Sequence, residues 1–154
     1  MNYTILSLFN ITTKVENKII YFIFDSTGVE YTELRMLQFI NDYKIILDDL
    51  EDTRIKNVCF VFKLNNMKFP SNFVLVQEFA NLFYPKMDLI IKKVNYSVIL
   101  SNNKIFYMFF TLLKQFYRPI KPLYLCNTND ELNDIIENPE NRIKYKNIID
   151  ELKE

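Results

Sequence analysis

The chain has no histidine and no tryptophan, and it contains a single glycine, Gly28, among its 154 residues. A Gly-rich loop that cradles phosphate needs several glycines, so a loop of that kind is excluded. The lack of histidine excludes a Ser-His-Asp triad, acid–base catalysis by imidazole and any zinc site with a histidine ligand. The sequence therefore names no reaction, and it directs attention to binding.

Alanine is almost absent too, with Ala80 as its single occurrence, whereas Asn, Lys, Ile, Phe and Tyr are abundant. These abundant residues have AT-rich codons, so the bias indicates an AT-rich genome, as in some viruses, protozoa and bacteria. The formal net charge is zero and no basic block stands out. The electrostatic footprint of a nucleic-acid-binding protein is therefore missing, and we expect no nucleic-acid partner.

The length fits one domain over residues 1–154, and 49% of the residues are hydrophobic. Cys59 and Cys126 lie inside apolar runs, which predicts buried, reduced thiols; a disulfide between two central strands is the less favoured alternative. No apolar stretch approaches the roughly 20 residues of a membrane span. We expect a cytoplasmic protein, located in the host cytoplasm if the genome is viral.

Five segments rich in apolar and β-branched residues predict strands. The continuous apolar run 58–62 is typical of a strand that is buried on both faces. Residues 3–11 and 18–24 predict a hairpin, with the polar stretch 12–17 between its strands. The expected strands cover residues 3–11, 18–24, 58–62, 94–100 and 123–126.

Apolar residues at helical spacing predict five helices. The first is expected from Glu30 to Leu50, with Thr27-x-x-Glu30 as a capping box, one apolar face and charges on the other face. Its expected core residues are Met36, Ile40, Tyr43, Leu47 and Leu50. The remaining helices are expected from Ser71 up to Pro85, over 104–117, from Thr128 up to Pro139, and over 140–153 as a C-terminal accessory helix within residues 140–154.

The expected order of elements is β-β-α-β-α-β-α-β-α-α. Strands that alternate with helices imply right-handed crossovers and a partly parallel sheet. The predicted fold class is therefore α/β, a mixed and mostly parallel sheet of about five strands flanked by four to five helices.

This order resembles the STAS domain, the anti-sigma-factor-antagonist fold, and the similarity extends to the sequence. Residues 61–71, VFKLNNMKFPS, are similar to the STAS stretch that runs from a central strand through a short loop into the next helix. Residues 96–102 and 122–132 are similar to the last two strands of the family and to the opening of its final helix. The resemblance covers roughly residues 3–137 and implies a single STAS-like domain.

In the STAS family, a motif Asp-Ser-x-Gly places a phosphorylatable serine at the N-terminus of a helix. Ser71 stands at about the corresponding place, while Pro70 replaces the aspartate and the glycine is lost. The resemblance makes Ser71 a candidate phosphoacceptor, and a plain helix N-cap is the alternative. The string Asp25-Ser26-Thr27-Gly28 matches the motif better, but three further strands follow it instead of two, so we interpret it as a strand-to-helix turn.

A second, narrower resemblance concerns residues 83–87, FYPKM, which precede an expected strand. They are similar to a Tyr-Pro element of the CRAL-TRIO (Sec14-like) lipid-binding lobe. This resemblance implies a small intracellular binder of a lipid or another apolar ligand, with its pocket between the sheet and the second and third helices. The expected lining is Phe79, Phe83, Phe109 and Leu113.

The helix expected over 104–117 is apolar on nearly every face, whereas covering one side of a sheet requires only an apolar stripe. Its excess aromatic surface has to meet the C-terminal helix, a second subunit, a partner protein or a lipid. The candidate interaction surface comprises Phe106, Tyr107, Phe109, Phe110, Leu113, Phe116 and Tyr117.

Few residues suit catalysis. Cys126 lies at the carboxyl end of an expected parallel strand, but no partner that would lower its pKa can be named, and a buried small hydrophobe is the favoured interpretation. The carboxylate pairs 48–49 and 130–131 lie in charged helix ends, where acid–base catalysis is not expected. No residues have metal-ligand spacing, and no cofactor is expected. The sequence favours a non-catalytic interaction or regulatory module, homodimeric or bound to another protein, over a binder of an apolar ligand.

Overall fold

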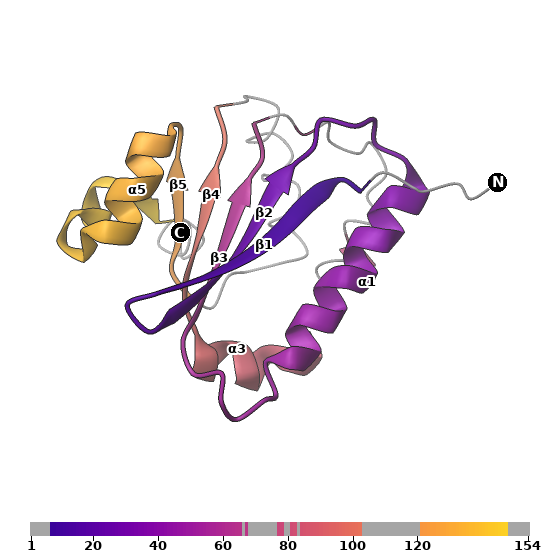
Figure 1. Cartoon of the computed structure of the whole chain (residues 1–154), viewed down its shortest axis with the longest axis horizontal. Helices are drawn as coiled ribbons and strands as arrows, with labels where there is room; N and C mark the ends of the chain where they lie inside the picture. Colours follow the sequence, from indigo (N-terminus) through magenta and orange to yellow (C-terminus); the bar gives the residue numbers. More distant parts are fainter. Residues whose placement is uncertain are drawn as a thin grey trace.

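The structure is a computed structural model, and it describes residues 7–65, 67, 77–78, 81–82, 84–102 and 121–147. Its elements form three layers, in which α1 covers one face of a central sheet and α5 covers the other (Figure 1). In chain order the elements are β1 (Phe9–Glu16), β2 (Ile19–Ser26), α1 (Glu33–Asp49), β3 (Val58–Lys63), the 3-10 helix η1 (Tyr84–Lys86), α3 (Met87–Lys93), β4 (Val94–Leu100), β5 (Leu123–Cys126), α5 (Asn129–Glu137), the 3-10 helix η2 (Pro139–Lys144) and β6 (Lys146–Asn147).

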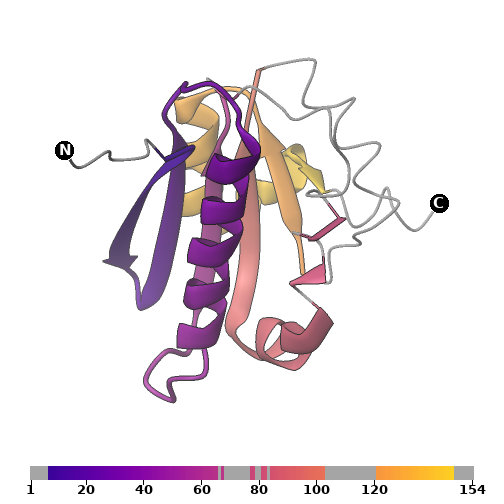
Figure 2. The same ribbon diagram turned by 90° about the vertical axis from the view of Figure 1, so that its right-hand side faces the viewer.

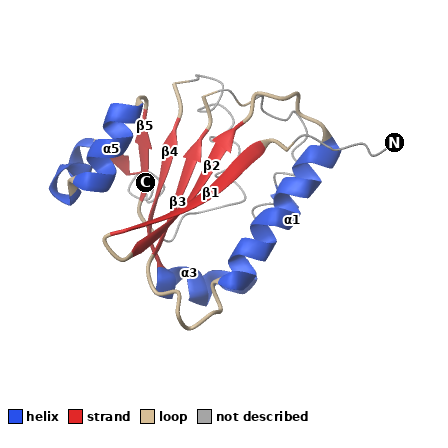
Figure 3. Ribbon diagram, in the orientation of Figure 1, coloured by secondary structure: helices blue, strands red, loops and turns tan. Residues whose placement is uncertain are grey.

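The sheet has its strands in chain order, β1-β2-β3-β4-β5-β6 (Figure 3). The strands from β2 to β5 pair in parallel, and β1 and β6 add antiparallel edges. The predicted α/β class with a mixed, mostly parallel sheet is confirmed. The short strand β6 brings the sheet to six strands instead of about five.

The first hairpin is tighter than the sequence suggested. Strand β1 continues through the polar residues to Glu16, and the turn consists of Asn17 and Lys18 alone, with φ angles of 52° and 67°. Two positive φ angles match the hairpin turn whose twist fits the flanking strands. The predicted polar spacer over 12–17 was wrong because β1 is an edge strand, so most of its side chains face solvent.

Helix α1 begins three residues later than predicted. Its N-cap is Thr32, whose Oγ1 accepts a hydrogen bond from the backbone N–H of Arg35 at 3.1 Å. Thr27 does not cap the helix. Instead, its hydroxyl donates to the carbonyl of Ser7 at 2.7 Å and ties the end of β2 to the start of β1. The helix ends at Asp49, with Leu50 as its C-cap, one residue before the predicted boundary.

An aromatic core fills the space between α1 and the sheet. Phe24 is fully buried at its centre, stacks on Phe62 at 4.7 Å between ring centroids and meets Phe39 edge-on. The ring centroid of Tyr43 in α1 lies 5.5 Å from that of Phe60 in β3. Figure 2 shows α1 in front of the sheet and α5 behind it, so the sheet is covered from both sides.

Residues 77, 78 and 81 of the predicted second helix are helical, and that helix ends before Pro85 as expected. Pro85 itself lies inside η1, which leads directly into α3, a helix that was not predicted from the sequence. Proline is well tolerated in the first turn of a helix, because its missing N–H has no intrahelical acceptor there.

The C-terminal part confirms one prediction and corrects another. Thr128 is the N-cap of α5, as the capping box predicted, and its Oγ1 accepts from the Glu131 N–H at 3.2 Å. The accessory helix over 140–153 is wrong for its described part, because η2 and β6 occupy residues 139–147. Ile143, which lies inside the predicted helix, is 90% exposed.

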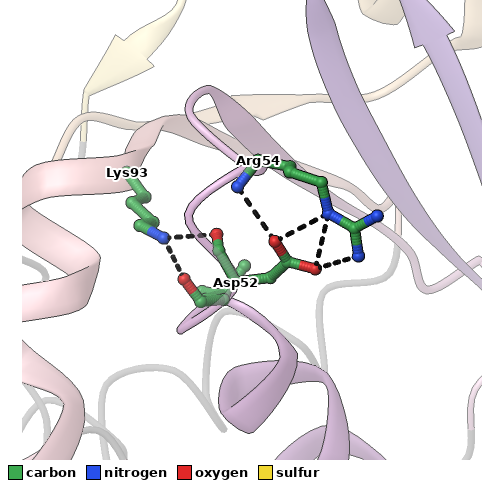
Figure 4. Close-up of polar contacts among 4 residues, drawn as sticks. Asp52, Arg54 and Lys93 are labelled. Carbon is green, nitrogen blue, oxygen red and sulfur yellow. Dashed lines mark hydrogen bonds and ion pairs between the residues drawn. The ribbon is translucent and has the colours of Figure 1, made fainter.

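A buried lysine connects the end of α1 to the start of β4. Lys93, at the end of α3, is 6% exposed, and its ammonium donates to the carbonyl of Leu50 and, at 2.9 Å, to the carbonyl of Asp52 (Figure 4). The carbonyls at a helix C-terminus lack intrahelical donors and carry partial negative charge. Lys93 therefore caps α1 from a distant part of the chain. The neighbouring loop is ordered by the Asp52 carboxylate, whose pKa falls to about 2 because Arg54 donates hydrogen bonds to it.

Replacing the Lys93 ammonium with an apolar group should destabilise the fold. Lys93→Met keeps most of the buried stem but leaves the carbonyls of residues 50 and 52 without their donor, so we expect the free energy of unfolding to fall by about 1–3 kcal/mol. Urea denaturation measures this change. Lys92→Met, at the exposed neighbouring position, is the matched control and should change the free energy by no more than about 0.5 kcal/mol. Equal effects of the two variants would contradict the capping role.

Candidate functional site

The predicted interaction and ligand residues lie outside the residues that the structure describes. This applies to the interaction surface over 106–117, to the apolar lining at Phe79, Phe83, Phe109 and Leu113, and to Ser71. Those assignments stay predictions. A candidate site therefore has to come from the described residues.

The carboxyl ends of the parallel strands carry several polar residues, and this edge is where open α/β sheets bind ligands. Here those groups bond to one another. The Asn65 Oδ1 accepts from the Asn102 N–H at 3.1 Å, and the Glu131 carboxylate accepts from the Asn127 N–H at 2.9 Å. The edge is thus held together by its own side chains, and no separate ligand is needed to explain them.

Asp25 and Ser26 are the last residues of β2, so the strand-to-helix connection interpreted from the sequence begins only at Thr27. Gly28 has a φ of 81°, which is costly for any residue with a Cβ. Ser26 is 7% exposed at the end of β2, so a kinase would not reach its hydroxyl without local opening.

The two thiols are buried and chemically quiet. Cys59 is fully buried and Cys126 is 3% exposed, and both are free. Burial raises the pKa of each to about 12, which keeps them protonated at neutral pH. A nucleophilic cysteine needs the opposite shift. The structure thus supports the interpretation of Cys126 as a buried small hydrophobe.

A row of tyrosines crosses the face of the sheet that α5 covers. Tyr21 of β2 and Tyr96 of β4 flank Cys59 of β3 in register, and their hydroxyls lie 3.3 Å apart. The guanidinium of Arg142 lies 4.0 Å from the centre of the Tyr96 ring. Burial raises the pKa of both tyrosines. Each of the two tyrosines is only 2% exposed, so the row joins η2 to the sheet and offers no surface to a substrate.

A single carboxylate organises the region after α5. Asp134 accepts from the side-chain amides of Asn138 at 2.8 Å and Asn141 at 2.9 Å, and from the Tyr145 hydroxyl at 2.7 Å. These bonds lower the pKa of Asp134 to about 2, because each favours the ionised form. All three partners are near in sequence, so Asp134 is a structural hub of the C-terminal segment.

The carboxylate pairs are likewise used in structure. Asp48, near the end of α1, forms an ion pair of 3.0 Å with Lys86 of η1. Glu131 completes the cap of α5. Within the described ranges, no group of three His, Cys, Asp or Glu residues could hold a metal ion.

The outer face of α1 carries the one apolar surface among the described helices that the core does not explain. Leu34, Leu37 and Ile45 recur at spacings of three and eight residues and are 57%, 46% and 52% exposed. We call these three residues the outer stripe. They lie opposite the buried residues Met36 and Tyr43, so α1 is apolar on two faces.

The outer stripe was not predicted from the sequence, because that face of the helix was expected to carry only charges. Charged residues are present there, but they flank the apolar ones. The missed signal was the spacing of Leu34, Leu37 and Ile45, which fits a second face of the same helix.

Comparisons with known proteins add no relationship to this picture. No family model matches the chain, and no curated protein or solved structure shows a significant match. In the part of the chain that the structure describes, no helix has both the length and the apolar character needed to cross a membrane. Any function therefore has to be argued from the surface.

The Asp134 hub predicts loss of stability in acid. The pKa of Asp134 is about 2 in the folded chain, against an ordinary value of 3.8. The stability that its ionised carboxylate contributes is therefore complete above about pH 4 and is lost as the pH falls toward 2. We expect Asp134→Asn to lower the free energy of unfolding at pH 7 and to differ less from the parent chain at pH 3. Urea denaturation at both pH values tests this. The control is Glu137→Gln, at an exposed carboxylate of the same helix, which should lower the free energy of unfolding at pH 7 by less. An equal decrease in the two variants would contradict the structural role of Asp134.

Proposed function

We propose that this chain is a non-catalytic protein–protein interaction module of STAS-like fold, and that the outer stripe of α1 is its docking surface. The observation that carries the proposal is the second apolar face of α1. A helix that only covers a sheet needs one apolar stripe, and its solvent side is polar. The solvent side of α1 does not follow this pattern, because it exposes Leu34, Leu37 and Ile45 on one face.

The stripe has the composition of a modest interface. Complete burial of a leucine or isoleucine contributes about 1.5–3 kcal/mol, so covering these half-exposed side chains contributes about 1 kcal/mol each. Arg35 and Asp42 lie on one flank and Lys44 on the other, which gives an apolar centre with a charged rim. Such an interface suits reversible association.

The chemistry of the described residues supports a role without catalysis. The thiols of Cys59 and Cys126 are held protonated, and Asp134 is engaged by three donors within the fold. The buried side chains of Tyr21, Tyr96 and Lys93 likewise form contacts within the fold. The free cysteines also fit a reducing compartment such as the cytoplasm.

The resemblance to STAS domains supports the same role at the level of the fold. The described elements keep the order that carries the resemblance, from the initial hairpin through the parallel strands to α5. Fold likeness alone does not assign a function, so the proposal depends on the surface of α1.

Site-specific photocrosslinking tests this docking surface. A benzophenone side chain at position 37, in the chain expressed in the organism that encodes it, should form protein adducts. A second change, Leu34→Glu, should remove most of them, because it places a charge inside the apolar contact.

The matched control places the same probe at Ile91, a half-exposed isoleucine of α3. We expect few adducts from that position. Adducts from position 37 that survive Leu34→Glu, or equal yields from positions 37 and 91, would contradict the proposal.

A further inference from the structure

Along the outer face of α1, apolar and polar residues follow each other in nearly the same order in both directions of the chain. Along this face the chain presents Leu34, Leu37, Gln38, Asn41 and Ile45 in order. The apolar groups stand toward the two ends. The exposed amide of Asn41 and the half-buried amide of Gln38, whose Oε1 is buried, stand in the middle. If a second α1 ran antiparallel to the first, apolar side chains would meet apolar side chains and amides would meet amides.

We propose that the partner of the outer stripe is a second copy of this chain, with the two α1 helices packed antiparallel about a two-fold axis. This inference rests on the proposed function and names its partner. In the register that sets Leu34 against Ile45 of the other copy, Gln38 meets Asn41. Each of these contacts occurs twice, as a two-fold axis requires.

The same register pairs the flanking charges. In antiparallel helices that pack side by side, each flank meets the same flank of the partner helix. Arg35 then lies opposite Asp42 of the other copy, and the reverse pair forms at the other end of the contact. On the opposite flank, the aliphatic stem of Lys44 lies along Leu37 and leaves its ammonium in water.

A parallel arrangement lacks this complementarity. It would set each flank against the opposite flank of the partner helix, so Arg35 of one copy would no longer meet Asp42 of the other. The two Arg35–Asp42 pairs therefore form only in the antiparallel arrangement. A second copy fits this contact because each helix carries both charges that the other requires.

The position of Arg35 within its own chain is compatible with this contact. Its Nη1 donates to the Glu30 carbonyl at 2.6 Å. A guanidinium has five N–H donors, so a hydrogen bond within its own chain does not by itself prevent an ion pair with a carboxylate of the partner. Because the apolar area is small, we expect a dimer that forms and dissociates with concentration.

Sedimentation velocity of the purified chain, up to about 1 mM, measures the association. Leu34→Glu should weaken it by about tenfold or more, which corresponds to about 1.4 kcal/mol. A glutamate in the first turn of α1 suits the helix dipole, so the monomer should stay folded. Ile91→Glu on α3 is the matched control and should leave the association unchanged.

Charge reversal tests the register. Arg35→Asp alone and Asp42→Arg alone should each weaken self-association about tenfold or more, because each sets like charges together. A mixture of the two variants restores both pairs across the interface. It should therefore form a heterodimer with a dissociation constant within about threefold of the parent dimer. Restoration by mixing also shows that both variants are folded.

The outcomes separate this inference from the proposed function. A monomer at every concentration, with crosslinks from position 37 to a different protein, overturns the homodimer and leaves the docking surface standing. A monomer without such crosslinks overturns both. A dimer that resists Leu34→Glu, or a mixture that fails to associate, overturns the antiparallel contact.

Discussion

Burial of β3 on both faces is the constraint on which the rest of the structure depends. Its residues from Val58 to Val61 are between 0% and 3% exposed. A strand with parallel neighbours on both sides has no face left for water, so each side of the sheet must be covered. Helix α1 covers one side with an aromatic core, and α5 with η2 covers the other. Contacts elsewhere in the fold then fix the positions of α1, α5 and η2 on the sheet.

The covering layers are fixed by polar groups that reach across long stretches of sequence. Lys93 caps the end of α1 from α3, and Arg142 stacks on Tyr96 from η2. Buried polar groups must be bonded, and these bonds also determine how each layer sits on the sheet. The same use of polar groups explains why the described interior offers no reactive centre. Its ionisable side chains are engaged in cohesion, and its thiols are shielded from water.

Local patterns predicted the central part of the fold well. Strands β4 and β5 match their predicted bounds, and the Thr128 cap of α5 was correct, because dense apolar runs and a capping box carry their own signal. Tertiary contacts decided the rest. The turn at Asn17 lacks the usual glycine, and η2 replaces the accessory helix where Asp134 gathers the side chains of Asn141 and Tyr145. The candidate site was missed because one helix carries two apolar faces, and the inner face dominated the pattern.

The central claim is that α1 has one apolar face for its own core and another for a second copy of the chain. Isotope-filtered NOE spectroscopy of a mixture of labelled and unlabelled chains tests it most directly. The account predicts contacts between the Leu34 methyls of one copy and the Ile45 methyls of the other, with no contacts from Leu34 to Leu34. Intermolecular contacts confined to other surfaces, or the absence of any at high concentration, would contradict it.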